Sequence, residues 1–220
     1  MPFRNRIEAG RKLTVALAGY KDQQPVILAL PRGGVLVAAE VAAALAAPLD
    51  LILVRKVGVP FQPELAMGAL VDGDVAIVVR NEDVIQHAGI EEADFAAACR
   101  SEFAEIERRR RLYLGSRERV EIAGCTAIVI DDGVATGATT RAALRAARLR
   151  GPNHLMLAVP VAPTDSLAEL RHEADDVICL EHYDAFGALG HYYHDFRHIT
   201  DDEVIEILAR FAPKPRPPSG

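Results

Sequence analysis

The sequence predicts an α/β fold with a doubly wound, mainly parallel β-sheet. Short apolar runs rich in β-branched residues alternate along the chain with segments of helical periodicity. The short runs are apolar on both faces, as in strands that helices cover on each side. Half of the 220 residues are hydrophobic, which suffices for one sizeable core.

The N-terminal half of the chain predicts two helices and three strands. Ile7, Leu13 and Leu17 recur with helical spacing, and the run PVILAL is typical of a buried strand that ends at the breakers after it. An alanine-rich helix follows and stops before Pro48. In chain order we predict a helix over 4–20, a strand over 25–30, a helix over 35–46, and strands over 49–54 and 75–79.

The C-terminal half continues the alternation. CTAIVI is the clearest strand in the chain, and Gly151-Pro152 is a stop signal for the helix before it. Ser166 with Glu169, and Thr200 with Glu203, match the capping box that opens a helix. In chain order we predict a helix over 91–113, a strand over 125–130, a helix over 138–150, a strand over 154–159, a short helix from 166, a strand over 177–180 and a helix from 200 to about 211.

Composition bounds the class of protein. The net charge of −6 argues against non-specific binding to nucleic acid or to anionic membranes. The N-terminus lacks the apolar segment of a signal peptide, and no apolar run is long enough to cross a bilayer. The three cysteines form no CxxC pair, so we expect reduced thiols in a cytoplasmic protein.

The residues that carry chemistry follow strand 125–130, where doubly wound sheets bind their ligands. The segment AIVIDDGVATGATT, residues 127–140, places Asp131 and Asp132 at the strand's end, and a loop of small residues leads from them into a helix. It is not a Walker A loop, because the lysine of that motif is missing. We assign phosphate binding to the loop and helix start: Ala135, Thr136, Gly137, Ala138, Thr139 and Thr140.

Each part of this segment has a physical role. A helix N-terminus offers unpaired N–H groups and partial positive charge to a phosphate, and small residues let the backbone approach it. Two carboxylates can accept hydrogen bonds from a vicinal diol and can help to hold Mg²⁺. The segment therefore predicts a site for a sugar phosphate, with Asp131 and Asp132 as metal ligands.

Cations follow the first two predicted strands. Arg32, Gly33 and Gly34 come after strand 25–30, where the glycine pair frees the backbone and Arg32 can fork onto phosphate oxygens. Arg55 and Lys56 end the second predicted strand, at the edge where we expect the anion. Both groups also fit ordinary strand ends with solvated side chains.

Residues 127–140 resemble the phosphoribosyl-pyrophosphate signature of type I phosphoribosyltransferases, and segment 57–70 resembles a little-characterised bacterial branch of that family. The resemblance implies a single phosphoribosyltransferase domain over 1–210, with a core of about 21–175 and a hood from the N-terminal helix and about 176–210. We expect the proline-rich residues 211–220 to be disordered. We also expect a homodimer.

The resemblance implies an enzyme that binds phosphoribosyl pyrophosphate with Mg²⁺ and displaces pyrophosphate with a nitrogen nucleophile, a purine base being one candidate. It gives catalytic roles to Asp131, Asp132, Arg55 and Lys56, and places the pyrophosphate in the Arg32–Gly34 loop. Residues 102–119, with four consecutive arginines, fit either the family's mobile catalytic loop or a salt-bridged exposed helix in which Glu105 pairs with Arg109.

The acceptor is left open. Residues 183–196 resemble the base-binding hood of hypoxanthine–guanine phosphoribosyltransferases, with Phe186 as the stacking platform. Two groups that would contact a purine are missing: an acid where this chain has Ala135, and a lysine near 155–163. A regulatory protein that senses a nucleotide or phosphoribosyl pyrophosphate, and a hydrolase or phosphorylase of a phosphorylated ribose, therefore remain alternatives.

Overall fold

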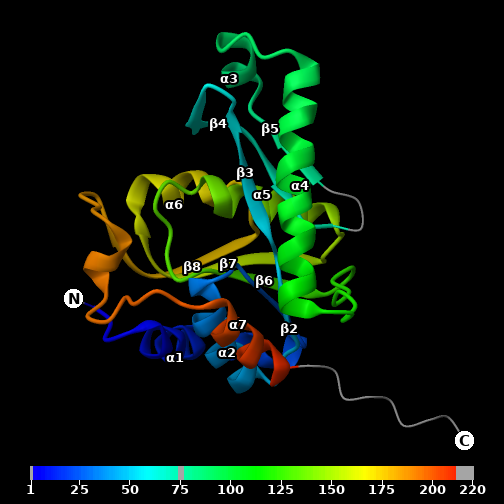
Figure 1. The fold of residues 1–220 in the computed structure, drawn as a ribbon. Coiled ribbons are helices and arrows are strands. Elements are labelled where there is room, and N and C mark those ends of the chain that lie inside the picture. Colours follow the sequence, from blue (N-terminus) through cyan, green and yellow to red (C-terminus); the bar gives the residue numbers. More distant parts are fainter. Residues whose placement is uncertain (1, 74–76, 212–220) are drawn as a thin grey trace, which may run out of the picture.

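The centre of the protein is a five-stranded parallel sheet, described in a computed structural model that covers residues 2–73 and 77–211 (Figure 1). The strand order is β2-β1-β6-β7-β8, and every neighbouring pair is parallel. The strands are β1 (Val26–Ala29), β2 (Leu49–Leu51), β6 (Thr126–Ile130), β7 (His154–Pro163) and β8 (Asp176–Tyr183). The predicted α/β fold with a parallel, doubly wound sheet is confirmed.

Helices cover both faces of this sheet. One face carries α1 (Arg6–Ala16), α2 (Gly33–Leu45) and α7 (Asp201–Ala209), and the other carries α5 (Ala138–Leu149) and α6 (Thr164–Leu170) (Figure 1). Side chains alternate along each strand between these two sides. In β1, Ile27 and Ala29 belong to the first face and Val26 and Leu28 to the second.

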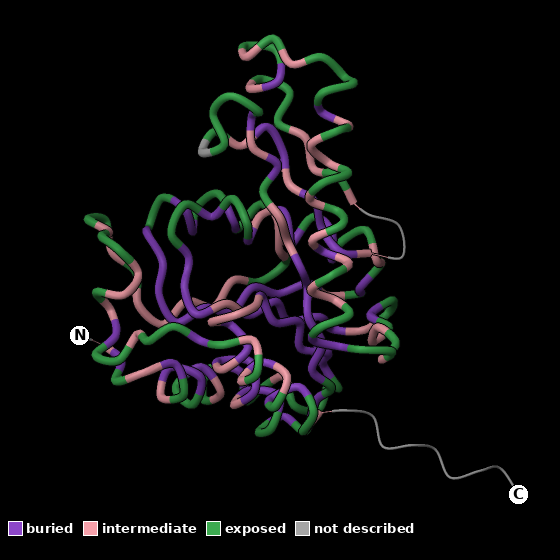
Figure 2. Tube along the Cα trace, in the orientation of Figure 1, coloured by how far each residue is buried: buried purple, intermediate pink, exposed green. Residues whose placement is uncertain are grey.

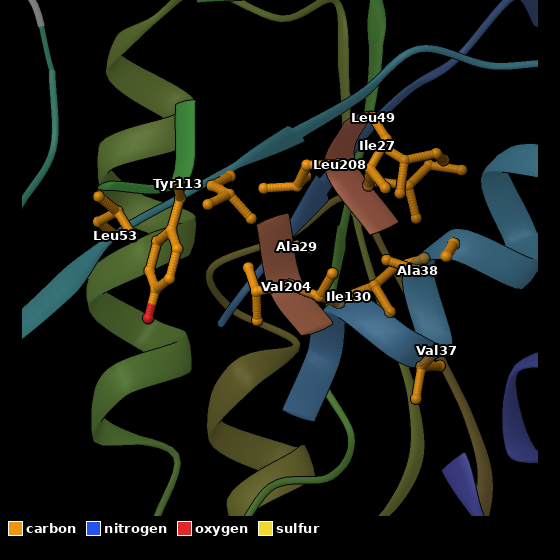
Figure 3. Packing of buried hydrophobic residues seen from close by; sticks show 14 of the residues in the cluster. Ile27, Ala29, Val37, Ala38, Leu49, Leu53, Tyr113, Ile130, Val204 and Leu208 are labelled. Carbon is orange, nitrogen blue, oxygen red and sulfur yellow. The ribbon is translucent and has the colours of Figure 1, made fainter. Parts of the chain in front are cut away.

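The first face is closed by residues from both ends of the chain. Figure 3 shows Val204 and Leu208 of α7 beside Ile27, Ala29 and Ala38. All of these side chains are buried, so the apolar surface that they remove from water stabilises the fold. Figure 2 shows much of the central sheet as buried, whereas β8 at its edge is mostly half-buried.

The strand order reverses direction between β1 and β6. From β1 the chain passes through α2 to β2 on one side, whereas β6 lies on the other side of β1. The loops after β1 and after β6 therefore diverge from a common point at the carboxyl end of the sheet. In open α/β sheets this switch point is where ligands bind.

A second sheet of three antiparallel strands stands out from the core as an arm (Figure 1). It consists of β3 (Val54–Val59), β4 (Gln62–Val71) and β5 (Ile77–Arg80), and it is followed by α3 (Glu82–His87) and α4 (Glu92–Leu114). Figure 2 shows that much of the arm is exposed or half-buried, unlike the core sheet.

The prediction of one strand over 49–54 is wrong, because this run contributes to both sheets. That run divides into β2, which pairs with β1, and β3, which pairs with β4. The backbone turns at Ile52 and Leu53: the Ile52 N–H still donates to the Ala29 carbonyl (3.0 Å), whereas the Leu53 carbonyl accepts from Asp72 of the arm (2.8 Å). The predicted strand 75–79 corresponds to β5 from residue 77, and its first two residues lie outside the described ranges.

The long predicted helix over 91–113 is confirmed as α4, and the helical interpretation of its arginine run holds. Glu105 accepts from Arg108 (2.7 Å) and from Arg109 (2.8 Å), the predicted i,i+4 pair. Arg110 reaches instead to the buried Asp72 at the base of the arm (3.0 Å), where Arg119 is a second partner. Within the described chain, none of the helices combines the length and apolar character needed to cross a membrane.

One of the two predicted capping boxes is present. Thr200 and Glu203 cap α7 reciprocally, as predicted. The box at Ser166 is wrong, because α6 already begins at Thr164, after Pro163. The Ser166 hydroxyl instead donates to the Ala135 carbonyl (3.1 Å) and so fastens the loop that follows β6. The predicted tail 211–220 lies outside the described residues from 212 onward.

Candidate active site

Asp131 and Asp132 stand at the carboxyl end of β6, where the sequence predicts them. β6 is buried along its whole length, which fixes the position of the two acids that follow it. The Asp131 Oδ1 atom accepts the Asp132 backbone N–H (2.8 Å). Desolvation and the neighbouring Asp132 carboxylate raise the pKa of Asp131 well above its ordinary value. Two adjacent acids in this setting favour a cationic or hydrogen-bond-donating ligand.

The loop from Gly133 to Gly137 is fastened on both sides. The Val134 N–H donates to the Val161 carbonyl of β7 (2.9 Å), and Ser166 holds Ala135. Gly137 has a φ of 74°, a left-handed conformation in which glycine is unstrained, and it forms the N-cap of α5 without a side-chain cap. The first N–H groups of α5 therefore have no capping side chain and are free to bind an anion.

The threonines around this helix start differ in exposure. Thr136 and Thr139 are exposed, as are Ala135 and Ala138, so these four residues can meet a ligand. Thr140, in the first turn of α5, is buried. The loop and helix start thus present mainly backbone N–H groups and two hydroxyls.

The loop after β1 lies directly against the acids. A Cβ atom at Gly33 would overlap the Asp132 carboxylate, and one at Gly34 would lie 2.8 Å from the Ile130 carbonyl oxygen. The Pro31–Arg32 peptide bond is cis, and α2 begins at Gly33. The structure therefore brings the predicted Arg32–Gly34 loop and the predicted acids into one site.

The Arg32 side chain is turned toward the C-terminal part of the chain. Its Nη2 atom lies 2.7 Å from His198 Nε2, and its Nη1 atom lies 3.6 Å from an Asp201 carboxylate oxygen at the start of α7. The backbone of the loop, rather than this guanidinium, is the part that borders the acids.

Arg55 and Lys56 do not stand at the end of a core strand as predicted. They lie in β3 of the antiparallel arm, because the second core strand ends at Leu51. The Arg55 Nε atom donates to Glu102 of α4 (2.7 Å). The structure thus separates this pair from the parallel sheet on which the sequence placed it.

Phe186 lies beside the loop that follows β6. One side of its ring is stacked on Tyr192, with 4.6 Å between the centroids. Phe186 also lines a cavity of about 500 Å³, together with residues of the loop, the start of α6 and its own segment: Ala135, Thr136, Pro163, Asp165, Ser166, Glu169, Asp184 and Gly187.

Three residues at the site are not among the predicted site residues, although two of them, Tyr193 and Phe196, fall within the predicted hood segment 183–196. Arg6 donates through Nε to the Asp132 Oδ2 atom (2.6 Å), the Tyr193 hydroxyl donates to the Asp132 carbonyl (2.5 Å), and Phe196 covers the Arg6 guanidinium. Arg6 thus lies about 190 residues before the segment that contains Tyr193 and Phe196. The sequence carried no signal for Arg6, because its burial cannot be read from the spacing of residues along α1.

The site fits a magnesium ion. Mg²⁺ in proteins commonly uses one or two carboxylates and takes its other ligands from water and substrate phosphates. Asp131 and Asp132 supply two carboxylates beside an anion-binding loop. Over residues 2–73 and 77–211 no group of three or more histidine, cysteine or acidic side chains could hold a metal by itself.

The fold and these two loops define a doubly wound α/β protein with its candidate site at the switch point. The model of the phosphoribosyl transferase domain matches residues 4–197, and the chain belongs to this family. Two curated Mycobacterium tuberculosis proteins, from strains CDC 1551 and H37Rv, carry the provisional name phosphoribosyl transferase. Each is 44% identical to this chain over 208 residues, which are 94% of this chain and 46% of the relative.

The chain thus spans less than half the length of these curated relatives. A solved structure, that of TT1426 from Thermus thermophilus, is 38% identical with a TM-score of 0.81, and the match covers 97% of this chain and all of that one. The family model spans the core sheet and the arm, and the match to TT1426 covers almost all of this chain.

Proposed function

We propose that the protein transfers the phosphoribosyl group of 5-phosphoribosyl 1-pyrophosphate to a nitrogen nucleophile, with Mg²⁺, and releases pyrophosphate. The observation that carries this proposal is the contact between Gly33 and Asp132, because it puts a glycine-rich loop, two acids and an uncapped helix start around one point. Membership of the phosphoribosyl transferase domain family supports the same activity.

Each part of the donor has a matching part of the site. The 5-phosphate would bind to the loop from Ala135 to Thr139 and the N–H groups of α5. The ring hydroxyls would donate to Asp131 and Asp132. The pyrophosphate would lie on the backbone of the Arg32–Gly34 loop, which its two glycines bring directly against the end of β6.

The reaction needs little covalent catalysis by the protein. The sugar carbon passes through an oxocarbenium-like state, as in glycoside chemistry, so the site has to align the two reactants and keep water away. Asp131 and Asp132 would hold the Mg²⁺, whose positive charge would offset the negative charge of the leaving pyrophosphate. We include Arg55 and Lys56 as further cations for the pyrophosphate; Arg55 would first have to leave Glu102.

The acceptor would bind in the cavity beside Phe186. The Tyr192 stack holds the ring, which can then support a planar base; stacking of this kind contributes about 1–3 kcal/mol per base. Ala135 offers no acid to read a purine, and β7 carries no lysine. We therefore propose a planar nitrogen heterocycle, with purines as candidates, that is recognised mainly by stacking.

We also propose how the domain divides, where the protein is located and how it assembles. We propose that the core of about 21–175 carries the donor site, and that the N-terminal helix with about 176–210 forms the hood. A cytoplasmic location and a homodimer complete the proposal.

The decisive experiment follows pyrophosphate release from the donor with Mg²⁺ across adenine, hypoxanthine, guanine, xanthine, uracil and simple amines. Pyrophosphate release that depends on one of these acceptors supports the proposal. Release of ribose 5-phosphate without an acceptor points to a hydrolase, and tight donor binding without any turnover points to a sensor. Phe186→Ala should raise the KM for the acceptor and leave donor affinity unchanged.

A further inference from the structure

Arg6 is a buried cation that joins the acids to the C-terminal part of the chain. Only 8% of its side chain is exposed, and its Nε atom donates to Asp132 Oδ2 at 2.6 Å. Its Nη1 atom donates to the Arg197 carbonyl at 3.0 Å. Its guanidinium carbon lies 3.8 Å from the centre of the Phe196 ring, within cation–π distance. One side chain therefore contacts both the candidate site and residues 196–197.

Asp132 is held from a second direction by the same segment. The Tyr193 hydroxyl donates to the Asp132 backbone carbonyl at 2.5 Å, and Tyr193 is buried. Phe3 packs against Tyr193, with 5.4 Å between the ring centroids, and its carbonyl accepts the His194 N–H at 3.0 Å. The N-terminal segment and residues 193–197 thus form one unit that holds both the side chain and the backbone of Asp132.

These contacts leave the two oxygens of the Asp132 carboxylate in different environments. Oδ2 lies between Arg6 and Gly33, where even a Cβ atom on Gly33 would overlap it. Only Oδ1 remains for a ligand. Asp131 is placed differently: its Oδ1 atom accepts the Asp132 N–H, and the charge of Arg6 offsets only part of the unfavourable effect of burial and of the Asp132 charge.

Stability alone is a weak reason to keep this buried ion pair. Replacing a buried ion pair by apolar side chains of similar volume is often neutral or stabilising, because both ions lose their hydration. Apolar replacement would be easy here, since the rings of Tyr193 and Phe196 already lie against Arg6. Apolar residues could not, however, hold the Asp132 carboxylate in a fixed orientation, as Arg6 does through its hydrogen bond.

We infer that Arg6 is a positioning residue for the donor site. It turns Asp132 Oδ2 away from the donor, presents Oδ1, and makes the orientation of this carboxylate depend on where residues 193–197 lie. The inference rests on the proposed function, since it assumes that Asp132 contacts the donor. It adds a physical link between the aromatic segment beside the acceptor cavity and the acids that hold the donor.

The test compares Arg6→Gln and Arg6→Lys with Arg11→Gln, all in the full chain. Arg11 lies on the same helix and forms an exposed ion pair with Glu40 (3.0 Å), so it controls for a charge lost from α1. Calorimetry with phosphoribosyl pyrophosphate and Mg²⁺ should give at least about 10-fold weaker binding for Arg6→Gln and unchanged binding for Arg11→Gln. Arg6→Lys should recover part of the loss, because lysine keeps the positive charge but lacks the planar guanidinium that bonds both Asp132 and the Arg197 carbonyl.

Amide hydrogen exchange without ligand provides a readout that does not depend on the donor. Arg6→Gln should speed exchange at residues 131–134 and at 192–197 together, by about 10-fold or more, and Arg11→Gln should not. Thermal unfolding shows whether Arg6→Gln is folded; if it is not, Arg6→Lys answers both questions. Unchanged exchange in the Arg6 variants would overturn the link.

The outcomes separate this inference from the proposed function. If the wild-type chain binds the donor and Arg6→Gln binds it equally well, the proposed function stands and the role of Arg6 is overturned. If the wild-type chain does not bind the donor, the proposed function fails and the positioning role fails with it.

Discussion

Gly33 lies so close to Asp132 that a single methyl group on this glycine would overlap the carboxylate. The loop after β1 and the end of β6 are therefore in direct contact, with no side chain between them. Two segments about 100 residues apart in the sequence are in this way fixed as the two walls of one site.

Gly33→Ala should disrupt this contact. We expect a loss of about 1–3 kcal/mol in the free energy of unfolding from overpacking, and at least about 10-fold weaker donor binding as Asp132 is displaced. Gly19→Ala is the matched control, because nothing lies within 4 Å of its added Cβ. Denaturant titration and calorimetry give the two quantities. Wild-type donor affinity in Gly33→Ala would refute the assignment of this contact to the donor site.

Gly137→Val should abolish donor binding while the fold survives. The valine side chain would restrict the backbone and occupy space beside the N–H groups of α5. Gly151→Val controls for strain, because Gly151 follows the other end of α5 with a similar φ of 70° and has nothing within 4 Å. Both variants should lose about 1–3 kcal/mol of stability, and only Gly137→Val should lose the donor. Equal donor affinities in the two variants would rule out this loop as the phosphate site.

Asp131→Asn and Asp132→Asn should each lower turnover at least ~100-fold, from the loss of about 2.7 kcal/mol of charge-assisted stabilisation. Their stabilities should differ. Asp132→Asn leaves Arg6 buried without its carboxylate and should be destabilised, whereas Asp131→Asn removes a carboxylate whose pKa is raised by burial and should not be. Steady-state kinetics and thermal unfolding measure both effects. Near-normal turnover in either variant would contradict the role given to that acid.

Donor binding should require a divalent cation. Without one, the charged pyrophosphate would approach two adjacent carboxylates, and the ion pair with Arg6 offsets the charge of Asp132 alone. Calorimetry in chelator should give at least about 10-fold weaker binding than with Mg²⁺. Equal affinity under both conditions would remove the metal from the mechanism.

Ionisation of Tyr113 should lower the free energy of unfolding at alkaline pH. Its hydroxyl donates to Asp201 (2.5 Å), and burial with this partner raises the pKa of Tyr113 to about 12. A pKa raised above the ordinary value near 10 means a contribution that is intact below about pH 10 and is lost as the pH rises through about 12. The unfolding free energy of wild type should exceed that of Tyr113→Phe by about 1 kcal/mol near neutral pH. This difference should disappear by about pH 12; a difference that stays constant would show that ionisation of Tyr113 is not involved.

Most of the core sheet and the loop from Asp131 to Thr140 could be predicted from the sequence, because apolar runs, breakers and helix signals there agree with one another. The arm could not. β4 reads PELAMGAL over much of its length, with proline, glycine and alanine where a strand signal needs β-branched residues, so nothing marks it as a strand. The positions predicted for Arg55 and Lys56 were wrong for a related reason. No break in the apolar run separates β2 from β3, so the two strands read as one.

The support around Asp132 was beyond sequence reasoning for a different reason. Arg6, Tyr193 and Phe196 meet only through long-range packing, and no spacing within one segment predicts such a contact. Ser166 shows the converse error. It matched a local capping pattern, yet tertiary packing used its hydroxyl to hold Ala135.

The two faces of the core sheet also differ in when they can form during synthesis. The face with α5 and α6 draws its buried residues from positions 26–170, so it can close before the last part of the chain leaves the ribosome. The opposite face includes Ile199, Val204, Ile207 and Leu208, and its apolar surface stays open until α7 has emerged. A chain stalled before α7 would therefore expose α2 and α4 to solvent or to chaperones, even with the loops at the carboxyl ends of β1 and β6 already made.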